Sequence, residues 1–161
     1  MLQPLLATLD KLIELQKQLI GFADKKRTVL IERKIDDLDI LAKKESELLK
    51  QLGDVEAERQ QLAEELLKAQ PDMTFKEFIE GLPDSIMRKK LQARTELLQQ
   101  LLLELQAKNK TNEHLLLDSM NFVQHMIEQV TKSKQQHFNY QSPLGQQKQQ
   151  TSSRGFFDTK A

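Results

Sequence analysis

The chain of 161 residues contains no cysteine and no tryptophan, only five glycines and four prolines, and 5% aromatic residues. Without cysteine, disulfide bonds, thiolate catalysis and cysteine-ligated zinc are excluded, and a reducing compartment is permitted. No apolar run approaches the ~18 residues that a membrane span needs, and the N-terminus lacks a cationic region before its apolar residues. We therefore expect a soluble, unexported protein, with the cytoplasm as its default location.

An excess of either charge is also missing, because 24 basic side chains face 24 acidic ones. This balance removes the usual electrostatic argument for binding nucleic acid or an anionic membrane. The charge is nevertheless uneven along the chain. Residues 131–161 carry Lys132, Lys134, Lys148, Arg154 and Lys160 against Asp158 alone, so this segment is cationic and residues 1–130 are anionic.

The residues that usually build a catalytic or metal site are sparse. His114, His125 and His137 are the only histidines, and the first two are separated by about 16 Å along a helix. His125 and Glu128 form at most a local pair, and the chain has no glycine-rich phosphate loop and no strand-turn-helix serine motif. We predict no catalytic residue, no metal, no cofactor and no enzymatic activity.

Apolar residues recur at steps of three and four over most of residues 2–130, which predicts an all-α protein. We expect helices over residues 2–33, 36–70, 75–80 and 84–131. The three long helices would form an elongated antiparallel three-helix bundle or coiled coil over residues 1–131, with the short helical turn between the second and third. Residues 132–161 would form a flexible, glutamine-rich tail that has too little apolar area to fold alone.

Local signals support these boundaries. Asp36 and Asp37 offer N-cap oxygens for the second helix. Thr74 and Glu77 match a capping box that opens the short helix, and Gly81 would end it. Polar residues at packing positions, Glu45 and Arg59, are expected to fix the register or to pair across helices.

The third helix should exceed the first two by about 14 residues, because about 48 residues are predicted for it against about 30 and 34. This excess, residues 117–130, remains apolar on one face. The residues concerned are Phe122, Val123, Met126, Ile127 and Val130. Such a face without an intramolecular partner predicts a surface for another protein.

Several motifs, in this order, resemble the FlgN family of flagellar export chaperones. They are the N-terminal leucines, Leu48-Leu49-x-x-Leu52 followed by Arg59, Asn109-x-x-Asn112-x-x-Leu115-Leu116-x-x-Ser119, the Tyr140 to Gly145 segment, and the ending Phe157 to Ala161, which is similar to Gram-positive members. The resemblance covers nearly the whole chain.

The resemblance implies a cytoplasmic chaperone that holds the hook-filament junction proteins FlgK and FlgL before secretion by the flagellar type III apparatus. Family members grip the C-terminal segments of these clients with their own C-terminal amphipathic part. The matching client-binding residues here are Leu115, Leu116, Ser119, Phe122, Val123, Met126, Ile127 and Val130. Tyr140 matches the tyrosine that docks to the cytoplasmic domain of the export gate, with Phe156 and Phe157 as alternatives; contact with the export ATPase complex stays open.

A second function remains compatible with the residues alone. Exposed heptads self-associate, so the chain could be a structural coiled-coil adaptor whose apolar face is covered by a second copy. A weak homodimer is also compatible with the chaperone hypothesis. The mass of the protein in dilute solution, with and without a client, discriminates between the two functions.

Overall fold

The computed structural model describes residues 1–139, with side chains described up to residue 133, and contains four helices in that range. They are α1 (Leu2–Glu32), α2 (Ile35–Leu67), α3 (Phe75–Glu80) and α4 (Ser85–Asn139). The described part contains no strand, which confirms the predicted all-α class. The chain divides into two compact units, Met1–Leu116 and Leu117–Ala161, and α4 contributes to both.

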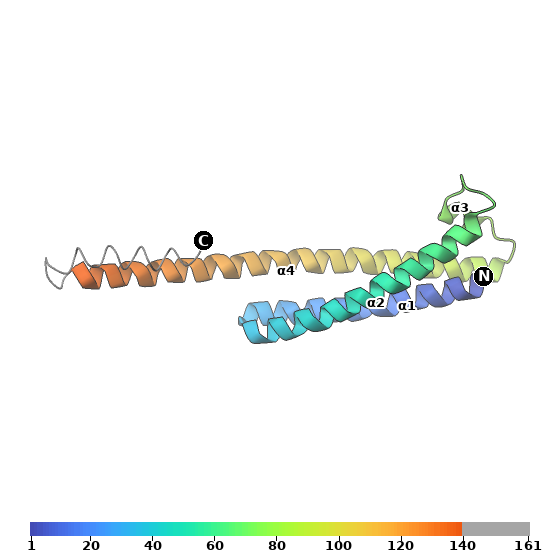
Figure 1. The fold of residues 1–161 in the computed structure, drawn as a ribbon. Helices are drawn as coiled ribbons and strands as arrows, with labels where there is room; N and C mark the ends of the chain where they lie inside the picture. Colours follow the sequence, from blue (N-terminus) through green and yellow to red (C-terminus); the bar gives the residue numbers. More distant parts are fainter. Residues whose placement is uncertain (140–161) are drawn as a thin grey trace. The chain divides into compact units, whose positions relative to one another are not determined.

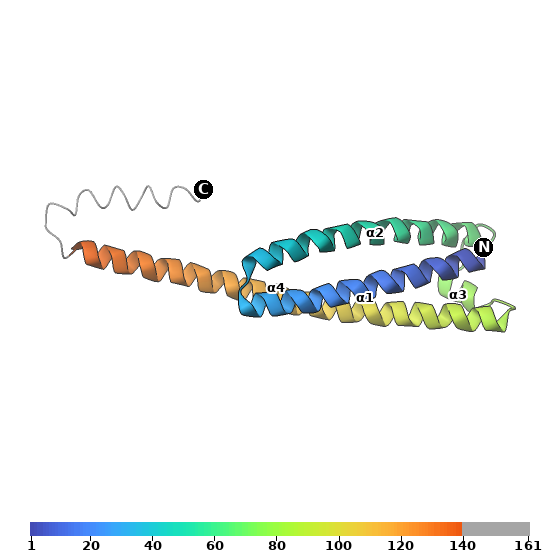
Figure 2. The same cartoon turned by 90° about the horizontal axis from the view of Figure 1, so that it is seen from below.

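Within the first unit, α1 lies between α2 and the N-terminal half of α4 (Figures 1 and 2). α1 and α2 run antiparallel, and α3 lies where α2 ends and α4 begins (Figure 1). The burial pattern agrees with a central α1, because eleven of its residues are buried whereas only Ala63 is buried in α2. The first unit is therefore a helix bundle whose core is built mainly from α1.

The apolar spacing predicted for the first two helices is confirmed. The α1 positions at this spacing are all buried or half-buried, with Leu5, Leu9 and Leu12 no more than 2% exposed. They are Leu2, Leu5, Leu9, Leu12, Gln16, Leu19, Ala23, Lys26 and Leu30. The α2 positions are half-buried: Leu38, Leu41, Glu45, Leu48, Leu52, Val55, Arg59, Leu62 and Leu66. The stripe on α2 thus faces the bundle but is not sealed from solvent.

The register between α1 and α4 is fixed by polar pairs at equal offsets. Arg94 binds Asp10 at 3.0 Å and Lys108 binds Asp24 at 2.5 Å, and each pair is 84 residues apart. This offset is twelve heptads, so the two helices run parallel with a common heptad frame. The same offset places the end of α1, Glu32, opposite Leu116, which is the last residue of the first unit.

Asn112 strengthens this register from inside the interface. It is buried, and its side-chain amide donates a hydrogen bond of 2.9 Å to the carbonyl oxygen of Ala23. A buried polar group that binds one position of the facing helix disfavours shifted alignments.

Between α1 and α2, Lys26 pairs with Glu45 at 2.6 Å, so the expectation that Glu45 pairs across helices is confirmed. Arg59 pairs with Glu56 of its own helix instead.

The helix boundaries differ from the predicted ones where local chemistry was misread. α2 begins at Ile35 after Lys34, without a side-chain cap, so the N-cap role expected of Asp36 and Asp37 is wrong; both lie in the first turn, where the helix dipole favours them. α4 continues to Asn139, eight residues past the predicted end at 131. Residues 132–139 contain no glycine or proline, and extending an existing helix costs little.

The predicted capping box of α3 is confirmed. The Thr74 hydroxyl accepts a hydrogen bond from the backbone N–H of Glu77, and the Glu77 carboxylate accepts one of 2.8 Å from the backbone N–H of Thr74. Gly81 follows as the C-cap. α3 buries Ile79 in the core, and the guanidinium of Arg59 lies 6.0 Å from the ring centre of Phe75. This short helix therefore closes one end of the bundle.

The capping box predicts a pH dependence. The hydrogen bonds from the backbone and the hydroxyl of Thr74 lower the pKa of Glu77 below its ordinary value. A depressed folded-state pKa adds stability above the unfolded pKa, and this contribution is lost as pH falls through the folded value. We expect Glu77→Gln, which keeps an acceptor oxygen, to flatten the loss of stability below about pH 4.5. Urea unfolding between pH 3 and 7 measures this; an unchanged acid profile would contradict it.

Two glycines inside long helices predict stabilising substitutions. Gly21 lies in α1 and Gly53 in α2, and a Cβ atom added at either position meets nothing within 4 Å. Neither has a positive φ, so alanine fits both backbones. Because glycine in a helix interior costs roughly 0.5–1 kcal/mol relative to alanine, each Gly→Ala change should raise the free energy of unfolding by that amount. Thermal denaturation of the two single variants and the double variant measures this. A lowered melting temperature in any of them would contradict the prediction.

Candidate protein-binding surface

The C-terminal part of α4 presents an apolar stripe on one helix. Leu116, Met120, Val123, Ile127 and Val130 follow one another at steps of four, three, four and three, which places them on one face. A second row beside it contains Leu115, Ser119, Phe122 and Met126. We call these nine residues the α4 face.

Most of the α4 face is exposed. Leu116 and Phe122 are 41% exposed, and the exposed fractions of Val123, Met126, Val130 and Met120 lie between 49% and 60%. Leu115, Ser119 and Ile127 are half-buried. In the first unit, α4 buries the heptad positions of the second row, because Met87 and Leu101 correspond to Leu115 and Phe122, and Leu91 corresponds to Ser119 and Met126. The change follows the register, which pairs α4 with α1 only as far as Leu116.

The opposite side of this segment is polar. Asp118, Asn121, His125, Glu128 and Lys132 are all exposed and are spaced by three or four residues. The segment is therefore an amphipathic helix with both sides defined, which is the form in which helices present side chains to a protein groove. The nine residues of the α4 face include no charged side chain, so its recognition chemistry is apolar.

All eight predicted client-binding residues thus lie on one helical face, although the structure contains no client to test their role. The predicted set omitted Met120 and Leu117, which are 60% and 50% exposed. Met120 completes the row from Leu116 to Val130, so strict spacing of three and four would have found it. Leu117 flanks the face and carries no comparable spacing signal. Tyr140, Phe156 and Phe157 lie outside the described residues.

The described residues contain neither a candidate metal site nor a candidate membrane span. Within residues 1–139 no group of three or more His, Asp or Glu side chains could hold a metal ion. His125 and Glu128 are both exposed on the polar side of α4. None of the described helices is long and apolar enough to cross a membrane.

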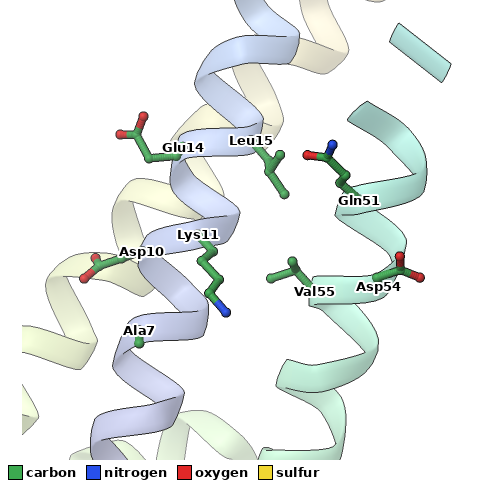
Figure 3. A pocket seen from close by; sticks show the side chains of 8 residues that line it. All are labelled: Ala7, Asp10, Lys11, Glu14, Leu15, Gln51, Asp54 and Val55. Atoms are coloured by element: carbon green, nitrogen blue, oxygen red, sulfur yellow. The ribbon is translucent and has the colours of Figure 1, made fainter. Parts of the chain in front are cut away.

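A surface groove lies elsewhere in the bundle, between α1 and α2, with a volume of about 730 Å³ (Figure 3). Leu15 of α1 and Val55 of α2 point into the space between the two helices, and charged side chains surround them. The groove contains none of the predicted client-binding residues.

The fold and the α4 face together define a class: an all-α helical protein with an exposed amphipathic helix face. The model of the FlgN protein family matches residues 1–148, nearly the full length of the chain. The chain belongs to the FlgN family of flagellar export chaperones. No curated protein and no solved structure matches the chain.

Proposed function

We propose that this flagellar export chaperone binds the C-terminal segments of the hook-filament junction proteins FlgK and FlgL in the cytoplasm. It prevents their premature assembly and delivers them to the export gate, and it acts by binding without catalysing a reaction. The observation that carries this proposal is the exposed apolar row from Leu116 to Val130, on a chain that belongs to a chaperone family.

The energetics of the α4 face support such a role. Full burial of a large apolar side chain contributes about 1.5–3 kcal/mol, and these side chains are roughly half exposed in the free protein. Covering five or six of them would then contribute roughly 5–8 kcal/mol before ordering costs are subtracted. Micromolar binding needs about 8 kcal/mol net, so the face alone falls short of it and further contacts of the client must contribute.

The chemistry of the face suits two different clients. Met120 and Met126 are both more than half exposed, and the flexible, polarisable thioether side chain of methionine adapts to differently shaped partners. An amphipathic client helix could dock its own apolar row along α4 by the same ridge-and-groove packing that holds α1. Asp118 and His125 lie on the opposite, polar side of the helix, so this side would stay in contact with water in the complex.

Delivery is assigned to the C-terminal tail. Tyr140, with Phe156 and Phe157 as alternatives, is the proposed contact with the cytoplasmic domain of the gate, and these residues are absent from the α4 face. Deleting residues 140–161 should leave client affinity unchanged and reduce gate binding and secretion. Loss of client binding in the deleted chain would contradict this division of labour.

The proposed function is tested by titrating the full chain with the C-terminal segment of each junction protein in a calorimeter, with the mass of the free and bound protein measured in parallel. We expect saturable 1:1 binding and a heterodimer. No binding to either segment, together with a dimer that persists on dilution, would instead establish the self-associating coiled-coil adaptor.

A further inference from the structure

The groove between α1 and α2 has an apolar floor and a charged border (Figure 3). Leu15, Val55 and Ala7 supply the aliphatic surface. Leu15 is 8% exposed and Val55 is half-buried, so the floor continues the core of the bundle to the surface. A volume of about 730 Å³ has room for several aliphatic side chains.

Two ion pairs join the helices that form the walls of the groove. Lys11 pairs with Glu58 at 3.7 Å at the groove, and Lys26 pairs with Glu45 at 2.6 Å farther along α1. Both pairs join α1 to α2 in the same antiparallel register, in which the apolar stripes of the two helices pack. The surfaces of two neighbouring helices form a groove into which a further helix can pack.

The border on the α2 side has one sign of charge. Glu47, Gln51, Asp54, Glu58, Gln61 and Glu65 are spaced by four and three residues, so they form one row along the helix, and all six are exposed. The row contains four carboxylates, two amides and no cation. Gln51 and Asp54 line the groove directly, and Glu58 is the partner of Lys11. Among the described residues, Glu47, Asp54 and Glu65 take part in no ion pair.

We propose that this groove docks a cationic amphipathic helix from another protein, with apolar side chains on the floor and Lys or Arg side chains against the α2 row. The apolar floor explains the contact area, and Asp54 at the groove, with Glu47 and Glu65 farther along the same row, selects the charge of the occupant; the lining cation Lys11 is already paired with Glu58. Anionic lipid and nucleic acid are disfavoured by the same carboxylates. The site shares no residue with the α4 face and does not depend on the client proposal.

A synthetic helix provides the probe. We would use a labelled 14-residue peptide with leucines at steps of three and four and lysines on both flanks of that row. A second peptide carries glutamate at every lysine position. Fluorescence anisotropy with the full chain should show saturable binding of the cationic peptide, weakening as salt is raised, and no binding of the anionic peptide. Equal binding of both peptides, or binding of neither, would overturn the proposal.

Charge reversal locates the site. Asp54→Lys changes an exposed residue at the groove, and we expect it to weaken binding of the cationic peptide by about tenfold or more, with Gln51→Lys acting in the same direction. Glu96→Lys is the matched control, because Glu96 is exposed on α4, lies outside the groove and makes the same change in net charge. It should alter affinity by less than about twofold. Equal losses in Asp54→Lys and Glu96→Lys would show attraction to net charge alone and would overturn the site.

Discussion

Replacing both Phe122 and Met126 by alanine should lower the affinity of the chaperone for a junction-protein C-terminal segment by roughly 30- to 100-fold. The two side chains are 41% and 51% exposed in the free protein, so a client covers about half of each. Half of the usual burial energy, together with the holes left against the client, amounts to about 2–3 kcal/mol, which is the stated fold-change. Calorimetry with the wild-type chain and the double variant measures it.

The matched control removes exposed apolar surface from another part of the same helix. Ile86 and Leu103 are 67% and 61% exposed and lie in the first unit, away from the α4 face. The Ile86→Ala, Leu103→Ala variant should retain the wild-type affinity. If both double variants lose affinity equally, the client does not recognise the α4 face; if neither does, the client binds elsewhere on the chain.

The sequence alone was sufficient to predict the helices and the faces that pack. The spacing of leucines selected the half-buried positions of α2 and the buried positions of α1, because burial in a helix bundle follows helical periodicity. The capping box at Thr74 was equally readable, since both of its hydrogen bonds join residues three apart. These features depend on neighbours along the chain.

Features that depend on partners from other helices were less accessible. Arg94 and Lys108 lie at packing positions of α4, and their role in the register became visible only when Asp10 and Asp24 were placed opposite them. The α1–α2 groove likewise has no sequence signature, because its lining comes from two helices that meet in antiparallel order. For the α4 face, periodicity gave the location and could also have identified Met120, whereas the flanking Leu117 was found only from its exposed fraction.

Leu91→Ala should be the most damaging single substitution for folding among those considered. Leu91 is fully buried in a cluster with Leu5, Leu9, Ile79 and Leu82, so it joins α4 to α1 and to the end closed by α3. Truncating a buried leucine removes its transfer energy and leaves a cavity, which costs about 3–5 kcal/mol. We expect the melting temperature to fall by roughly 10 °C or more, as measured by circular dichroism.

Leu103→Ala is the control, since it makes the same chemical change on the same helix at a position that is 61% exposed. It should change stability by no more than about 0.5 kcal/mol. The Leu91→Ala variant also tests whether client binding depends on the bundle core. At a temperature where the Leu91→Ala chain remains folded, its affinity for the client should equal that of the wild type, because Leu91 lies in the first unit and seven of the nine residues of the α4 face lie in the second. Reduced affinity in the folded Leu91→Ala chain would show that client binding requires an intact bundle core, and the α4 face would then not act as a separate element.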